Sequence, residues 1–103
     1  MSKYKFNVKG LGLKQSKLLL RMAKEKLVIR VIHDWYDNST TIELQDESGD
    51  NSYESVPVQM MRSLGKRRLF YCMGWKPSLR ITIDTYSLNK RTIEALGLTN
   101  SEQ

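Results

Sequence analysis

The residues best suited to bind a ligand lie in one stretch, from Arg62 to Arg80. Within it, six cations are interleaved with three aromatic rings: Arg62, Lys66, Arg67, Arg68, Lys76 and Arg80 with Phe70, Tyr71 and Trp75. Ammonium and guanidinium groups displace counterions from phosphates, and flat rings stack on nucleotide bases. The combination favours binding of RNA or single-stranded DNA.

A second set of cations follows the period of a helix. Four of them share one side of a helical wheel over residues 13–26, opposite an apolar side: Lys14, Lys17, Arg21 and Lys24 against Leu19, Leu20, Ala23 and Leu27. Any solvated helix face also needs polar residues, so the stripe alone carries little information. The candidate nucleic-acid site combines it with part of the first stretch: Lys14, Lys17, Arg21, Lys24, Arg62, Lys66, Arg67, Arg68, Tyr71, Trp75, Lys76 and Arg80.

The net charge of +6 is unevenly distributed along the 103 residues. Residues 1–33 contain nine bases and one acid, residues 34–54 contain seven acids and no base, and residues 55–103 contain eight bases and three acids. The nucleic-acid hypothesis therefore requires the two basic stretches to lie side by side, facing solvent and free of carboxylate partners. If they are separated or paired internally, a docking role takes its place.

That docking role is the alternative hypothesis. A regulatory protein of the kind that phages and mobile elements make would bind a host protein and modulate it. The partition of charge would steer such a protein towards a charged partner and orient it there.

Catalytic and metal-binding groups are scarce. His33 alternates with apolar residues, so we expect a strand histidine with both ring nitrogens satisfied. Cys72 lies in an apolar run, so we expect a buried thiol, and as the sole cysteine it can form no internal disulfide. Neither a zinc site nor a calcium loop has the necessary ligands, so we expect a non-enzymatic protein with no cofactor and no metal. A histidine-poor ribonuclease toxin using Arg67, Arg68 and Tyr71 is the remaining enzyme hypothesis.

The elements expected to position these residues alternate between strand and helix periods. We predict strands over 3–9, 27–36, 41–45, 69–73 and 79–85, and helices over 13–26, 55–65 and 87–98. A hairpin spans 27–45, a polar acidic loop 46–53, and a turn 74–78. Ser55 is expected to cap the second helix, and Ser87 or Asn89 the third. Residues 99–103 are expected to be a disordered tail.

These elements indicate one α+β domain over residues 1–103. We expect a mostly antiparallel sheet of about five strands with two to three helices, in the order β-α-β-β-α-β-β-α. No apolar run reaches the length of a membrane span or of a signal peptide. With its single cysteine, the chain is expected to be cytoplasmic, with no contact with a membrane.

Overall fold

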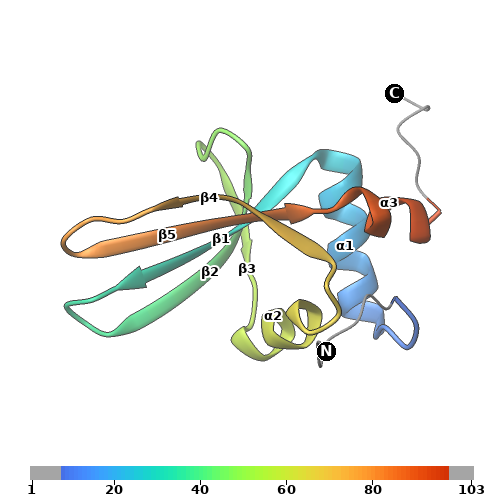
Figure 1. The fold of residues 1–103 in the computed structure, drawn as a ribbon, viewed down its shortest axis with the longest axis horizontal. Helices are drawn as coiled ribbons and strands as arrows, with labels where there is room; N and C mark the ends of the chain where they lie inside the picture. The colour runs from blue at the N-terminus through green and yellow to red at the C-terminus, as the bar shows by residue number, and fades with distance from the viewer. Residues whose placement is uncertain (1–7, 98–103) are drawn as a thin grey trace, which may run out of the picture.

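The structure is a computed structural model, and it describes residues 8–97. Five antiparallel strands form one sheet in the order β3-β2-β1-β5-β4, and three helices gather at one end of it (Figure 1). The elements are α1 (Leu13–Glu25), β1 (Leu27–Asp34), β2 (Ser39–Asp46), β3 (Ser52–Ser55), α2 (Val58–Gly65), β4 (Phe70–Lys76), β5 (Ile81–Leu88) and α3 (Lys90–Ala95). The α+β prediction is confirmed, as is the order of the predicted helices and hairpins. The strand predicted over residues 3–9 falls largely outside the described residues.

The hairpin predicted over residues 27–45 is formed by β1 and β2, which pair along their whole length. β1 ends at Asp34, two residues before the predicted end at Tyr36. Asp34 Oδ1 accepts hydrogen bonds from the backbone N–H groups of Tyr36 (2.9 Å) and Asp37 (3.4 Å), which turns the chain early. Asn38 then takes a left-handed φ of 54°, which asparagine tolerates better than most residues.

The short edge strand β3 overlaps the predicted acidic loop over 46–53 and the start of the predicted second helix. The loop prediction is wrong at its end, because Ser52 pairs with β2 and its hydroxyl donates to the Glu43 carboxylate at 3.0 Å. The predicted cap is also wrong. Ser55 pairs with Glu43 in the strand, and α2 begins after Pro57, which provides no side-chain cap.

The remaining part of the loop is organised by Asp46. Its Oδ1 accepts hydrogen bonds from the backbone N–H groups of Gly49 (2.8 Å) and Asp50 (3.0 Å) and from the Ser48 hydroxyl (2.9 Å). Its Oδ2 accepts one from the Asn51 amide at 2.8 Å. These bonds favour the ionised carboxylate, and with the Asn51 side chain as the largest cause they lower the pKa of Asp46 from 3.8 to about 2.

This shift predicts that the loop loses stability in acid. A carboxyl whose pKa is lower in the folded than in the unfolded state stabilises the fold above about pH 4, and the effect is lost as the pH falls to about 2. In urea denaturation between pH 5 and pH 2, the free energy of unfolding of Asp46→Asn should therefore fall less than that of the wild type. Asp37→Asn is the control, because within residues 8–97 the Asp37 carboxylate has no hydrogen-bond partner. Equal acid sensitivity in the wild type and Asp46→Asn would contradict the assignment.

The first and third helices follow from their sequence patterns. α1 buries Leu18, Leu19 and Met22 and leaves its cations on the outer side. α3 begins at Lys90, because the three preceding residues complete β5 and supply the cap. Of the two predicted caps, Asn89 is the one used: its side chain accepts a hydrogen bond from the Thr92 backbone N–H at 2.8 Å.

The hydrophobic core occupies only the helical end of the molecule. It is formed by α1, α2 and the nearby ends of the strands: Leu18, Leu19, Met22, Leu27, Ile29, Ile42, Leu44, Val56, Leu64, Leu69 and Leu88. Residues 30–41 and 70–87 contain no buried side chain. The outer halves of the β1–β2 and β4–β5 hairpins therefore project from the core without a helix to cover them (Figure 1).

Candidate functional site

The twelve residues predicted to form one site lie in different parts of the molecule. Four of them, which we call the cationic end, surround the contact between α1 and α2: Lys14, Lys17, Arg62 and Lys66. At that contact, Gln15 Nε2 donates a hydrogen bond to Ser63 Oγ at 3.1 Å. Trp75, Lys76 and Arg80 instead belong to the β4–β5 hairpin, which leads away from the helices. At about 3.3 Å per strand residue, Trp75 lies roughly 16 Å along β4 from its first residue.

The acidic segment 34–54 neutralises two of the predicted cations. Arg21 Nη1 lies 2.8 Å from Glu54 Oε1, and its Nε lies 3.1 Å from Glu25 Oε2. The Arg21 guanidinium also lies 5.3 Å from the centroid of the Tyr53 ring. Arg80 pairs with Asp34, with Nη2 3.1 Å from Oδ2. These two guanidinium groups are therefore already paired with carboxylates of the protein itself.

Three further predicted cations are not part of the cationic end. One lies far from it, and the other two belong to segments that hydrogen bonds hold in place. Lys24 is in the last turn of α1, about 15 Å along the helix from its first turn. Arg67 donates hydrogen bonds to the carbonyl oxygens of Lys9 and Gly10, which fastens the turn before α1. Arg68 has a left-handed φ of 59°, and its carbonyl accepts a hydrogen bond from Asn89 Nδ2 at 3.0 Å.

The two predicted stacking rings lie on opposite faces of the sheet, and a β-bulge explains this. β4 pairs Phe70 with Leu88 and Tyr71 with Ser87, but the register shifts by one residue between Cys72 and Gly74. Trp75 consequently pairs with Asp84, whereas the unshifted register would pair it with Ile83 and turn its ring to the other face.

The same bulge brings Trp75 to the face that carries Trp35. Trp35 Nε1 donates a hydrogen bond to Thr82 Oγ1 at 2.8 Å. Thr82 and Asp84 are two residues apart on β5, so their side chains point to the same face of the sheet. Both tryptophans therefore lie on the same face of the sheet. The helices cover one end of this face, and the tryptophans lie at the other end, which is uncovered. Sequence periodicity alone does not place Trp75 on this face, because it contains no signal for the bulge.

The tips of the two hairpins are tied together by several contacts. The Trp35 backbone N–H donates to the Arg80 carbonyl at 2.7 Å, and the Arg80 guanidinium lies 4.9 Å from the centroid of the Tyr36 ring. The hydrogen bond from Arg80 is the largest cause of the lowered pKa of Asp34. The two tips therefore present one joined surface.

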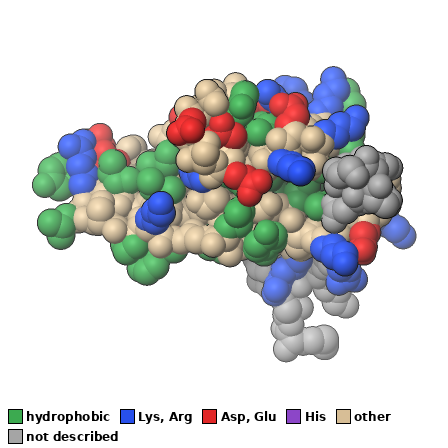
Figure 2. Space-filling view, turned by 90° about the horizontal axis from the view of Figure 1, so that it is seen from above, with side chains coloured by type: hydrophobic (Ala, Val, Ile, Leu, Met, Phe, Trp, Pro, Cys, Tyr) green, Lys and Arg blue, Asp and Glu red, His purple; other side chains and the backbone are tan. Residues whose placement is uncertain are grey.

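We call this joined surface the distal surface and define it by five residues: Trp35, Tyr36, Trp75, Leu79 and Arg80. The exposed fractions of its apolar side chains are large: 59% for Trp35, 76% for Tyr36, 63% for Trp75 and 100% for Leu79. Figure 2 shows hydrophobic side chains gathered at this narrow end and Lys and Arg gathered at the opposite, helical end. Exposed apolar residues are common singly on the surface of a monomeric protein, but here several lie together at one end of the molecule.

Two predictions about reactive side chains need correction. Cys72 is exposed rather than buried, because β4 is an edge strand that no helix covers at that point, and its thiol donates a hydrogen bond to the Gly74 carbonyl at 3.4 Å. His33 lies on β1 as predicted, and its Nδ1 contacts Thr40 Oγ1 at 2.9 Å. Its Nε2 is buried and has no hydrogen-bond partner among residues 8–97, so the ring is only half satisfied. The ring centroid lies 4.3 Å from that of Trp35 in an edge-on arrangement.

Trp35, Tyr36 and Leu79 are not among the site residues predicted from the sequence. A signal was available for the first two, because they immediately precede the turn residues Asp37 and Asn38. Large apolar side chains at the turn of a hairpin lie beyond the covered part of a sheet, so their exposure could have been predicted. Leu79 has the same relation to the β4–β5 turn.

Among residues 8–97, no helix has the length and apolar character needed to cross a membrane. Comparisons with protein-family models, with curated proteins and with solved structures find no match to this chain. Function is therefore inferred from the surfaces of the molecule alone.

Proposed function

We propose that this chain is a non-enzymatic, cytoplasmic protein that docks on a partner protein through its distal surface. One observation carries the proposal: the β4 bulge and the contacts between the hairpin tips bring two exposed tryptophans to the uncovered end of one face of the sheet. Tryptophan, tyrosine and arginine are the residues that most often dominate the energy of protein interfaces. All three types are present in the distal surface.

The charge of this region favours a protein over a nucleic acid as the partner. The tip segments 33–40 and 74–84 contain three acids and two bases, so they have no excess of positive charge. The cation in the distal surface, Arg80, is already paired with Asp34. A phosphate backbone would gain little from such a surface, whereas a protein partner would remove the exposed apolar side chains of the distal surface from water, which is favourable.

The shape of the distal surface favours a different protein over a second copy of this chain. The hairpin tips form a narrow projection, and Leu79 at the β4–β5 turn is entirely exposed (Figure 1). A projection is buried best in a recess, and two identical projections would cover little of each other. We therefore expect the partner to provide an apolar recess for the tips.

Capture from a nuclease-treated lysate of the source organism tests the proposal with a pair of matched variants. Leu79→Glu puts a charge into the distal surface. The substitution should not change the stability of the fold, because the Leu79 side chain is fully exposed. Leu13→Glu makes the same substitution at a 72% exposed leucine in the first turn of α1. The wild type and Leu13→Glu should retain the same protein, and Leu79→Glu should lose it.

The captured protein is then purified and mixed with each variant, so that direct binding is measured. Retention of the partner by Leu79→Glu, or its loss from both variants alike, would contradict docking through the distal surface. A dimer of the wild-type chain that Leu79→Glu converts to a monomer would show that the surface serves self-association instead.

A further inference from the structure

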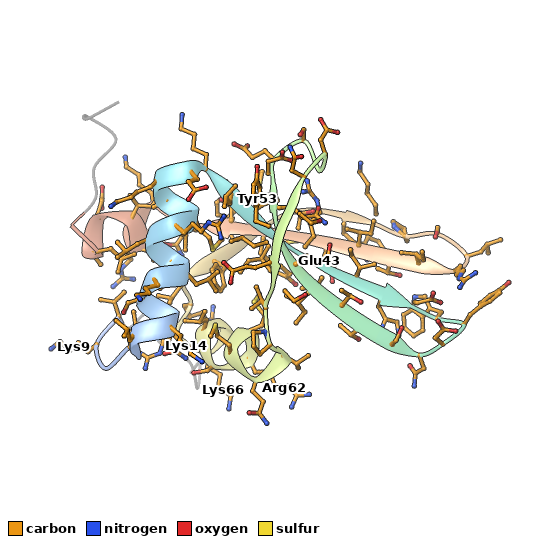
Figure 3. The ribbon with its side chains drawn as sticks, turned by 180° about the vertical axis from the view of Figure 1, so that it is seen from behind. Lys9, Lys14, Glu43, Tyr53, Arg62 and Lys66 are labelled. Atoms are coloured by element: carbon orange, nitrogen blue, oxygen red, sulfur yellow. The ribbon has the colours of Figure 1, made fainter. Side chains whose placement is uncertain are left out.

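The cationic end is built from two helices that a side-chain hydrogen bond joins. Gln15 on α1 and Ser63 on α2 are joined by their 3.1 Å hydrogen bond, and each is flanked by two of the cations. Lys14 and Lys17 also border a groove of about 440 Å³ between α1 and the segment from Glu54 to Met60. Figure 3 shows Lys14, Arg62 and Lys66 at the same end of the molecule. The four charges are thus gathered by the fold, although the sequence separates them into two pairs.

No carboxylate among residues 8–97 neutralises these four charges. Lys14, Lys17, Arg62 and Lys66 are all exposed, and in the part of the chain that the structure describes none of them forms an ion pair. α2 contains no acid, and α1 contains only Glu25, which pairs with Arg21 at its other end. Glu54, the acid that borders the groove, is held by Arg21 as well.

We infer that the cationic end binds the phosphate backbone of nucleic acid, as a second binding surface separate from the distal surface. The predicted stacking rings do not take part, because Tyr71 and Trp75 lie on β4 and point to opposite faces of the sheet. Tyr53, a ring on the edge strand β3, is 43% exposed, but the Arg21 guanidinium lies over one of its faces. Contacts to phosphate without contacts to bases give binding that is independent of sequence and depends strongly on salt.

The test is fluorescence anisotropy of a labelled 20-base-pair DNA duplex of arbitrary sequence, titrated with the full chain at several salt concentrations. Four phosphate contacts predict a slope of log affinity against log salt of about −3.6, which is a loss of roughly 150-fold in affinity between 50 and 200 mM salt. A quadruple variant replaces all four cations with glutamine: Lys14→Gln, Lys17→Gln, Arg62→Gln and Lys66→Gln. It should bind the DNA more than tenfold more weakly at 50 mM salt, and its affinity should lose most of the dependence on salt.

A second quadruple variant removes the same net charge outside the cationic end: Lys24→Gln, Lys26→Gln, Lys76→Gln and Lys90→Gln. All four of these lysines are exposed, and none forms an ion pair within residues 8–97. This control should keep nearly the wild-type slope. An equal loss in both variants would overturn the inference, because net charge rather than the cationic end would then govern binding, and a flat salt response of the wild type would do the same.

Tryptophan fluorescence, read in the same titration, separates the two surfaces. Both tryptophans of the chain, Trp35 and Trp75, belong to the distal surface, so DNA at the cationic end should leave their emission unchanged. Quenching by DNA would mean that the rings contact bases, which contradicts two separate surfaces. Leu79→Glu should bind DNA like the wild type, so failure of DNA binding and failure of protein docking are observed independently.

Discussion

Replacing Leu19 with alanine is expected to lower the free energy of unfolding by about 2–5 kcal/mol. Leu19 lies on the inner side of α1 and has no exposed surface, and the core that it fills occupies only the helical end of the molecule. Because the outer halves of the hairpins add no buried side chain, little apolar burial elsewhere can compensate for a cavity there. Urea denaturation followed by circular dichroism provides the measurement.

Leu13→Ala is the matched control for that experiment. It removes the same atoms from the same helix, but at a position that is 72% exposed, so the change should stay within about 0.5 kcal/mol. Similar losses at the two positions would contradict the placement of the core beneath α1.

Replacing both tryptophans with alanine should weaken binding of the partner protein by about 1,000-fold. Truncation of a tryptophan at the centre of an interface typically costs 2 kcal/mol or more, and each 1.4 kcal/mol changes the dissociation constant about tenfold. Trp35 and Trp75 are the largest side chains of the distal surface, and they share one face of the sheet. Titration calorimetry with the purified partner measures the change.

The control for the tryptophan pair is the double variant Leu13→Ala and Val58→Ala. Both residues are exposed apolar side chains, on α1 and α2, and neither belongs to the distal surface. We expect this variant to bind the partner as the wild type does. The free energy of unfolding is compared for all variants, so that a loss of binding is not mistaken for a loss of fold. A dissociation constant within threefold of the wild type after Trp35→Ala and Trp75→Ala would show that the rings lie outside the interface.

Local sequence patterns were sufficient to predict most of the fold. The period of the apolar residues identified α1, and the turn residues Asp37, Asn38 and Ser39 identified the β1–β2 hairpin. Asn89 was one of the two predicted caps of α3, because its side chain can accept a hydrogen bond from the backbone three residues later. Each of these signals acts within a few residues, so sequence position alone reveals it.

What could not be predicted depends on contacts between distant segments. β3 exists because Ser52 bonds with Glu43 on the neighbouring strand, and the pattern of its own four residues gives no strand signal. The side of the sheet to which Trp75 points depends on one bulge, since a shift of one residue reverses every side chain beyond it. Cys72 looked buried because it lies in an apolar run, but β4 is the edge strand.

The candidate site was only partly predictable for the same reason. Proximity of Lys14 and Lys66 follows from the packing of α1 on α2, which the helical wheel cannot show. The pairing of Arg21 with Glu54 joins the basic and acidic stretches across the fold, an outcome that the uneven distribution of charge had left open. The rings and the cations, which are neighbours in the sequence from Arg62 to Arg80, are drawn apart because β4 extends away from α2.

The proposed docking requires that the partner covers the distal surface. The two tryptophans of that surface report on this directly through their fluorescence. Acrylamide quenching of tryptophan emission is measured for the free protein and for its complex with a partner that has no accessible tryptophan. We predict strong quenching of the free protein, because Trp35 and Trp75 are each more than half exposed, and a several-fold smaller quenching constant in the complex. An unchanged quenching constant in a saturated complex would place the partner elsewhere and contradict the account.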